Sequence, residues 1–198
     1  MINLTSVNTL EGEFIQLRKI ALDDAHLIYK WRNSESGKYM NRPDGYSLEM
    51  QKKWISERPV NELNFIIVSK QQNSNVGMIS IVGISEQDRN AEVGRLLLAP
   101  EFLRTSNPYG LEALKLCNNL ILNTWGFNKV YGNVLADNLP MLRMQKYLGM
   151  IEEGLLRQQK SINGHFHDLY LVALFNTQFN KSYLPKINLL LRSFKTSN

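Results

Sequence analysis

The segment from residue 91 to residue 114 has the residue types and order expected of a site for an anionic ligand. An apolar strand, residues 91–98, is followed by a polar loop, residues 105–109, and a helix then begins at Gly110. The first backbone N–H groups of a helix have no acceptor within it, and the helix dipole adds partial positive charge at that end. Because phosphate groups bind readily there, an anionic ligand is one interpretation of this segment. The pattern by itself is a weak signal, since many α/β domains contain such a connection without any ligand.

Few other side chains are suited to nucleophilic or metal chemistry. The single cysteine, Cys117, falls on the apolar side of the predicted helix, so we interpret it as a core residue, and an internal disulfide is excluded. The chain has only three histidines, without cysteine partners, which provides no zinc-binding pattern. Strand alternation places Asp168 on the opposite face from His165 and His167, so they do not form an adjacent His-Asp pair. We therefore expect no metal.

Length and composition indicate one ordinary α/β domain. The chain has 198 residues, a formal net charge of +5 and a sequence pI of about 9.3. The first residues lack the pattern of a signal peptide, and no apolar run approaches the ~20 residues of a membrane span, so we expect a cytoplasmic protein. The positive charge suits an anionic partner. Because the sequence has no motif that binds in a groove of DNA or RNA, we expect this partner to be a small phosphorylated molecule and not a nucleic acid.

Hydrophobic periodicity in the first half predicts a meander of strands interrupted by two helices. We expect a strand over residues 14–18, a helix capped at residues 23–24, and a second helix capped by Ser47. Strands over residues 64–70, 76–84 and 91–98 then follow as an antiparallel meander.

The second half predicts a parallel crossover followed by a hairpin. The helix from Gly110 leads to a strand over residues 129–135, and a second helix begins near Asn138 and ends near Gly149. The dipeptide at residues 163–164 is a strong hairpin signal. We expect residues 1–175 to form the domain, and residues 176–198 to form a basic amphipathic extension that packs on the domain or on the partner of a homodimer.

Three of these stretches resemble the GCN5-related N-acetyltransferase (GNAT) superfamily: Ala99-Pro100-Glu101 after the strand, Gly110-Leu111-Glu112-Ala113-Leu114 at the helix start, and the segment from Asn138 to Gly149. The resemblance covers residues 12–175. It implies an α/β (α+β) GNAT fold, with a central mixed, mostly antiparallel, twisted sheet of about seven strands flanked by about four helices.

The resemblance also implies that acetyl-CoA or another acyl-CoA is the cofactor. The backbone of residues 96–98 would pair with the pantetheine amides, and Asn138 would meet the pantetheine arm. The phosphate loop departs from the family pattern, because residues 105–110 keep only the last glycine and Pro108 has no N–H to donate. The residues expected to bind the cofactor are Leu96, Leu97, Leu98, Arg104, Thr105, Ser106, Asn107, Tyr109, Gly110 and Asn138.

Transfer of an acyl group to an amine requires a neutral amine and a tolerated leaving thiolate. Glu92 matches a position that carries the base in some family members, and alternation would place it on the same side of the strand as Leu96 and Leu98. The tyrosine that serves many relatives as the acid is replaced here by Gln145, so either the thiolate leaves without a side-chain acid or another group, such as Tyr147 or Tyr109, serves as the acid. His167 is a candidate for orienting or deprotonating the amine. An ordinary structural role is the alternative for each.

The segment between the first two helices resembles enzymes that acylate amino groups on nucleotide-linked sugars. Arg32, Arg42, Tyr46 and Trp54 are the candidates for gripping a nucleotide diphosphate and stacking on its base, while a core role is the alternative for Trp54. We therefore expect an acyl-CoA-dependent N-acyltransferase, of acetyltransferase type, that acts on a nucleotide-linked amino sugar by direct attack in a ternary complex. A protein N-terminal or other small-amine acetyltransferase is one alternative, and a non-catalytic coenzyme A-binding module is another.

Overall fold

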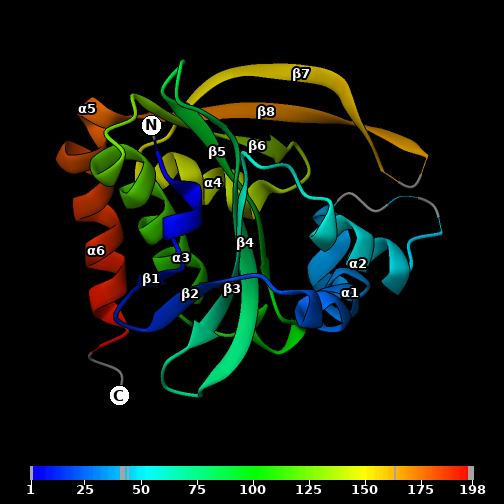
Figure 1. The fold of residues 1–198 in the computed structure, drawn as a ribbon. Coiled ribbons are helices and arrows are strands. Elements are labelled where there is room, and N and C mark those ends of the chain that lie inside the picture. The colour runs from blue at the N-terminus through cyan, green and yellow to red at the C-terminus, as the bar shows by residue number, and fades with distance from the viewer. Residues whose placement is uncertain (1, 41–42, 44, 163, 196–198) are drawn as a thin grey trace.

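A single mixed sheet forms the centre of the protein in the computed structural model, which describes residues 2–40, 43, 45–162 and 164–195 (Figure 1). The strand order is β1-β2-β3-β4-β5-β6-β8-β7, and only β5 and β6 pair in parallel. The eight strands exceed the expected seven by one; β1, of three residues, was not anticipated. The strands are β1 (Thr9–Glu11), β2 (Ile15–Lys19), β3 (Leu63–Ser69), β4 (Ser74–Ser85), β5 (Asn90–Leu98), β6 (Lys129–Leu135), β7 (Ile151–Ile162) and β8 (His165–Phe175).

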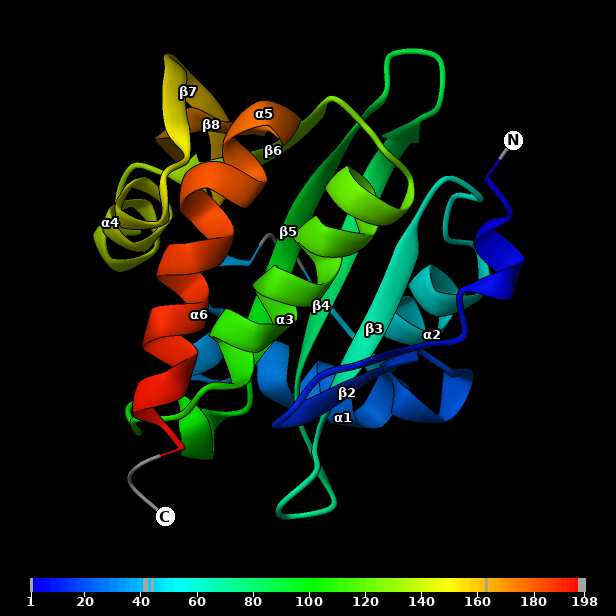
Figure 2. The ribbon, with the colours of Figure 1, turned by 90° about the vertical axis from the view of Figure 1, so that its left-hand side faces the viewer.

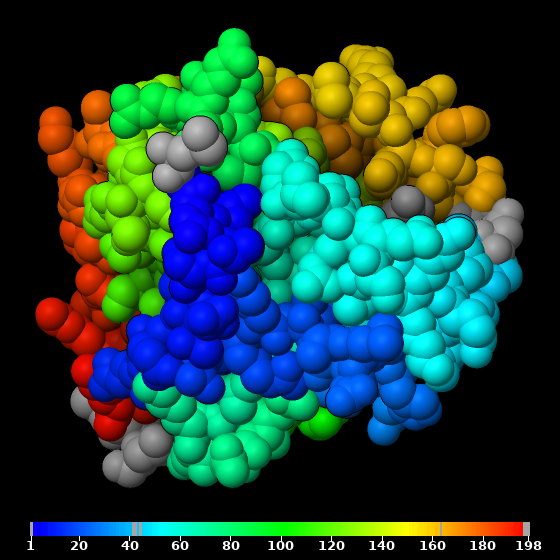
Figure 3. All heavy atoms as spheres, viewed as in Figure 1, coloured from blue at the N-terminus to red at the C-terminus, as the bar shows by residue number. Residues whose placement is uncertain are grey.

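Helices cover both faces of the sheet. On one face, α3 (Tyr109–Asn119) and α6 (Leu184–Ser193) lie side by side, with α4 (Leu139–Leu148) next to them (Figure 2). Apolar residues of all three helices enter the main core cluster. On the other face, α1 (Ala25–Arg32) and α2 (Leu48–Ser56) cover a second, smaller cluster. The residues before β2 cross the face shown in Figure 3, where they appear in blue.

Local capping explains where several helices begin and end. The side chain of Ser47 accepts a hydrogen bond from the N–H of Met50, and that of Asn138 accepts one from the N–H of Met141, as the sequence predicted. Gly149 ends α4 in the left-handed conformation at φ 108°, which glycine adopts without a steric penalty. Asp24 does not cap α1 directly; its carboxylate instead binds Arg18 and the N–H of Ala21, closing the 3₁₀ turn before α1.

A buried carboxylate fixes the first half of α3 against the start of β2. Glu112 is 2% exposed and accepts hydrogen bonds from the backbone N–H groups of Glu13, Phe14 and Ile15, at 2.7 to 2.9 Å. Such charge-assisted bonds to backbone groups are among the stronger ones in proteins. They hold the N-terminal turns of α3 in a defined place beside the sheet.

Residues after β8 pack on the main core. The short helix α5 (Asn176–Gln178) and a π-helical segment (Phe179–Tyr183) lead into α6. The side chains of Phe179, Tyr183, Ile187 and Leu191 are almost fully buried in the main core, whereas Leu189 is exposed. Asn118 of α3 donates a hydrogen bond to the hydroxyl of Tyr183. Within the described residues, no helix has the length and apolar character needed to cross a membrane.

Candidate functional site

A separation between β5 and β6 creates the space in which the site lies. The two strands pair in parallel only as far as Glu92 and Tyr131, although β5 continues for six more residues. A bulge then inserts one extra residue into β5, because Met78 pairs with Leu97 but Ser80 pairs with Gly94. Beyond Glu92, the backbone groups on the β6 side of β5 therefore no longer pair with β6, although β5 still pairs with β4 on its other side.

The bulge also reverses which side chains face which side of the sheet. Before it, Val93 enters the main core; after it, Leu96 and Leu98 pack on that same core. Glu92 lies on the opposite face, in a cavity shared with Arg95. The expectation that Glu92, Leu96 and Leu98 share one side is thus wrong, because simple alternation does not hold across an inserted residue.

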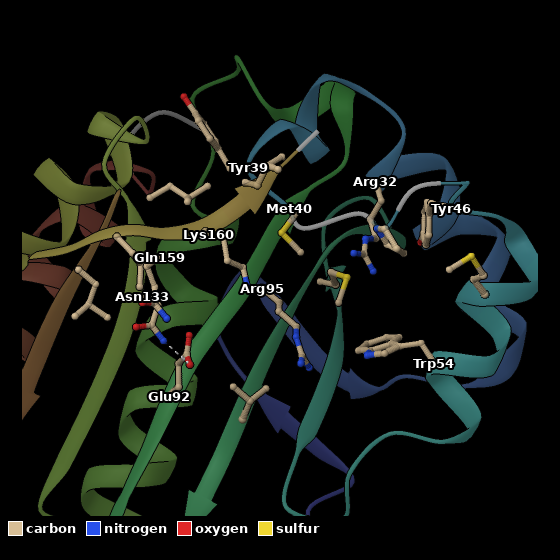
Figure 4. A pocket seen from close by; sticks show the side chains of 18 residues that line it. Arg32, Tyr39, Met40, Tyr46, Trp54, Glu92, Arg95, Asn133, Gln159 and Lys160 are labelled. Carbon is tan, nitrogen blue, oxygen red and sulfur yellow. Dashed lines mark hydrogen bonds between the residues drawn. The ribbon is translucent and has the colours of Figure 1, made fainter. Parts of the chain in front are cut away.

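Two adjoining hollows lie beside this part of β5. The larger cavity, of about 710 Å³, lies between α1, α2, β5 and the β7–β8 hairpin (Figure 4). The second hollow, here called the β5 groove, has a volume of about 590 Å³ and runs between the end of β5, α3 and α4. Tyr39 and Met40 line both of them. The hydroxyl of Tyr39 donates a hydrogen bond to the carbonyl of Asp137, which ties this segment to the start of α4.

Glu92 is the only carboxylate among the described residues that line the larger cavity. Burial raises the pKa of its carboxyl above the ordinary value, while a hydrogen bond from Asn133 and the charges of Arg95 and Lys160 act in the opposite direction. The amide of Asn133 donates to Oε2 at 2.8 Å. A carboxylate with a raised pKa, held in one orientation beside a cavity, is suited to accept a proton.

Some of the remaining polar groups of the larger cavity come from the segment that precedes β3, and the others come from β5, β6 and β7. Arg32, Tyr46 and Trp54, which the sequence predicted as substrate-binding residues, all line the cavity, whereas Arg42 lies outside the described residues. The guanidinium of Arg32 lies 4.9 Å from the ring centroid of Tyr46, and both side chains contact the Oε1 of Gln51. The structure thus brings the three predicted residues to one cavity with Glu92.

The β5 groove contains most of the residues predicted to bind the cofactor. Leu96, Leu97, Leu98, Arg104, Thr105, Asn107, Gly110 and Asn138 line it. Ser106 is not among the lining residues, and Tyr109 is 6% exposed, with its ring packed edge-on against Phe102 and its hydroxyl accepting a hydrogen bond from Ser69. The side chain of Tyr109 therefore points into the core and away from this groove.

The start of α3 presents backbone N–H groups toward this groove. Pro108 is the N-cap, and the N–H of Tyr109 is satisfied by the side chain of Asn107. Glu112 is the first residue whose N–H bonds within the helix, to the carbonyl of Pro108. Helix geometry thus leaves the N–H groups of Gly110 and Leu111, both of which line the groove, for an external acceptor.

The other predicted catalytic groups lie away from both hollows. Tyr147 is 56% exposed, and the ammonium of Lys186 lies over its ring. This tyrosine is not in a position to protonate a group bound in the β5 groove. His167 pairs with Asp137 at 2.7 Å and does not line the larger cavity, although it lies opposite Lys160, which does. Gln145 is 6% exposed, and its Oε1 has no hydrogen-bond partner among the residues that the structure describes.

Sequence reasoning missed several polar residues of the larger cavity: Tyr39, Arg95, Asn133, Gln159 and Lys160. Arg95 was hidden because alternation would turn it toward the core. Asn133 could have been found from the parallel pairing of β5 and β6, which brings it near Glu92. In the described residues, no cluster of three or more histidine, cysteine, aspartate or glutamate side chains could hold a metal ion.

Comparisons with known proteins agree with this architecture. Residues 15–151 match the family model described as the acetyltransferase (GNAT) domain. An uncharacterized N-acetyltransferase, p20, from Bacillus licheniformis is 25% identical over 189 residues, which cover 87% of this chain and 99% of the relative. The spermidine N(1)-acetyltransferase of Vibrio cholerae is 25% identical over 60% of this chain and 66% of its own length.

Solved structures are similar in fold at lower identity. A GCN5-related N-acetyltransferase from Brucella melitensis superposes with a TM-score of 0.75 at 16% identity, over 87% of this chain and 80% of its own. A mutant of the Vibrio cholerae spermidine/spermine N-acetyltransferase superposes with a TM-score of 0.72 at 18% identity, over 88% and 99%. At these identities the similarity supports the fold alone.

Proposed function

This chain belongs to the GNAT acetyltransferase family, and we propose that it transfers the acetyl group of acetyl-CoA to a primary amine that reaches Glu92 through the larger cavity. The position of Glu92 carries this proposal. Its carboxylate lies where β5 and β6 separate, on the wall of a cavity that meets a second groove. A base at this junction is within reach of an amine in one hollow and a thioester in the other.

The residues of the β5 groove fit acetyl-CoA. Past Glu92, β5 offers backbone N–H and C=O groups that an extended pantetheine arm would pair with as an added strand. The N–H groups of Gly110 and Leu111 at the start of α3 would hold phosphate, with Arg104 close by. When bound, acetyl-CoA supplies the acetyl group as a thioester whose carbonyl carbon is open to attack by a neutral amine.

Glu92 would accept the proton that the amine loses as the new amide bond forms, directly or through one water molecule. Asn133 orients the carboxylate, and the raised pKa strengthens it as a base at neutral pH. The position of the tyrosine acid of many family members is occupied here by Gln145, which has no acidic proton, and Tyr147 lies outside the groove. The amides on the β6 side of β5 beyond Glu92 would then stabilise the leaving group without a side-chain acid.

We favour an amine that is carried by a nucleotide-linked sugar. A volume of about 710 Å³ falls in the ordinary range for small-molecule sites. Aromatic side chains of Tyr46 and Trp54 are available for stacking, and Arg32 is available for a diphosphate. Longer acyl donors than acetyl would also have to fit the same junction.

A polyamine is the second candidate, since a relative from Vibrio cholerae is named as a spermidine N(1)-acetyltransferase. The charge of the larger cavity disfavours it. Among the described lining residues, Arg32, Arg95 and Lys160 carry positive charge and Glu92 alone carries negative charge. A trivalent cation such as spermidine would meet repulsion from this surface.

Thermal stabilisation followed by product analysis tests the proposal. Acetyl-CoA should raise the unfolding midpoint by mass action, and Gly110→Asp should remove that shift. Nucleotide-linked amino sugars, free amino sugars and spermidine are then incubated with acetyl-CoA, and N-acetylated product is measured by mass spectrometry. We expect turnover of the nucleotide-linked amines. Turnover of spermidine alone would replace our substrate assignment, and the absence of any shift with acetyl-CoA would contradict the proposal.

A further inference from the structure

Arg95 occupies an unusual backbone position. It is the residue at the β5 bulge and has a φ of 53°, in the left-handed region that L residues other than glycine seldom adopt. Such strained positions cluster at functional sites. Regular alternation from Val93 would point the Arg95 side chain into the core. Because of the bulge, the side chain points into the larger cavity instead.

A set of partly buried groups holds the guanidinium of Arg95 in place. Its Nη1 donates to Oε2 of Glu62 at 2.7 Å and to Oδ1 of Asn64 at 3.2 Å, and its Nη2 donates to Oε1 of Glu62 at 3.2 Å. The side chain of Glu62 is 8% exposed. Asn64 is itself fixed by the buried hydroxyl of Ser80 at 2.6 Å. A bidentate contact of this kind between a carboxylate and a guanidinium fixes the orientation of the guanidinium plane.

The opposite side of Arg95 faces the space between the proposed base and an aromatic ring. The guanidinium lies 5.3 Å from the ring centroid of Trp54, which is within the range of a cation–π contact. Figure 4 shows Arg95 between Glu92 and Trp54 along the cavity. A guanidinium has five N–H donors. Of these, three are used by Glu62 and Asn64 in the described part of the chain, so two are left for a ligand.

We propose that Arg95 is a specificity-determining residue that binds a phosphate or diphosphate group of the amine substrate. The inference rests on the proposed function for the identity of the reaction. It adds that Arg95 is the residue that selects amines carrying an anionic group over neutral and cationic amines. In this arrangement the amine lies at Glu92, the anionic group lies at Arg95, and Trp54 supports the guanidinium from the other side. Glu62 acts through Arg95 and is a positioning residue.

A purely structural ion pair would not require this geometry. An ion pair that only joins β5 to the residue before β3 could be made from an ordinary strand position, without a left-handed residue and without exposure to the cavity. Here the arginine side chain of the pair is 33% exposed and lines the cavity, while the carboxylate is buried behind it. The cation is therefore presented to a ligand and the anion is shielded from it.

Isothermal titration with uridine diphosphate and with uridine, both in saturating free CoA, tests the inference without turnover. We expect the wild-type protein to bind the diphosphate at least about tenfold more tightly than the nucleoside, since a hydrogen bond to a charged group is worth that much. Arg95→Gln should remove most of this difference and leave uridine binding unchanged. Arg95→Lys should retain part of the preference for the diphosphate, because lysine keeps the positive charge but lacks the bidentate geometry of the guanidinium. Arg192→Gln, an exposed charge removed from the end of α6, is the control.

The possible outcomes separate the two proposals. If the diphosphate preference depends on Arg95 but no amine is acetylated, the proposed function fails and the anion site stands. If amines are acetylated but Arg95→Gln weakens the diphosphate and the nucleoside equally, or if neither probe binds the wild-type protein, the assignment of Arg95 is overturned. The unfolding midpoint of each variant shows whether a loss of binding reflects a loss of the fold.

Discussion

The side-chain amide of Asn133 donates a hydrogen bond to Oε2 of Glu92 at 2.8 Å, across the opening between β5 and β6. Asn133 lies two residues beyond Tyr131, the last residue of β6 that pairs with β5. The bond therefore spans the point at which the strands separate. It connects the proposed base to the neighbouring strand just where the backbone no longer does.

Asn133→Ala should move the pH dependence of acetyl transfer. The hydrogen bond from Asn133 lowers the pKa of Glu92 against the effect of burial, so its removal should raise that pKa further. Because the base must be ionised, the acidic limb of the kcat/KM profile should shift to higher pH in the variant. Initial rates at a series of pH values measure this shift. Asn119→Ala, a substitution of a half-buried residue at the end of α3 and outside both hollows, should leave the acidic limb at its wild-type pH.

Glu92→Gln should stabilise the fold at neutral pH. Burial raises the pKa of Glu92 in the folded protein above its ordinary value of 4.5. The ionised carboxylate is thus penalised on folding, and the stability of the wild-type protein falls as pH rises from the ordinary value through the raised one. Denaturant unfolding at pH 7 should show a more stable variant, and the difference should close at a pH below 4.5. An equal difference at both pH values would contradict the assigned direction.

Gly110→Asp should weaken coenzyme A binding while the fold persists. A Cβ atom at this position meets only ordinary contacts, with Leu96 and Leu98 at 3.6 and 3.9 Å. An acidic residue in the first turn also favours a helix, by about 0.3 to 1 kcal/mol. The same carboxylate repels phosphate at the N–H groups of the turn, so calorimetry should show a Kd raised by about tenfold or more. Gly110→Ala is the matched control, and equal affinity in both variants would remove α3 from the phosphate site.

The sequence was sufficient for the order of elements because local signals agreed with one another. The apolar runs of β3 to β6, the cap residues Ser47 and Asn138, and the turn glycines at 149 and 164 each predicted an element or boundary that the structure confirms. The resemblance to GNAT proteins then predicted how these elements assemble. Both kinds of signal depend on residues close together in the chain.

The site was predicted less completely, since its geometry depends on one inserted residue. Alternation along β5 fails at Arg95, so neither its entry into the cavity nor the separation of Glu92 from Leu96 could be obtained from periodicity. The burial of Tyr109 and the exposure of Tyr147 likewise depend on contacts with distant segments, Ser69 in one case and Lys186 in the other. Pairings of this kind have no local signal.

The rate of acetyl transfer by Glu92→Gln, measured beside the affinity for coenzyme A, tests the central claim most directly. Glutamine retains the shape of the side chain and can still bond to Asn133, but it cannot accept a proton. We predict a fall in kcat of about 10² or more, with an almost unchanged Kd for coenzyme A. Glu57→Gln, an exposed residue outside both hollows, should retain full activity. An unchanged rate in Glu92→Gln across the pH range would remove Glu92 as the base and contradict the proposed mechanism.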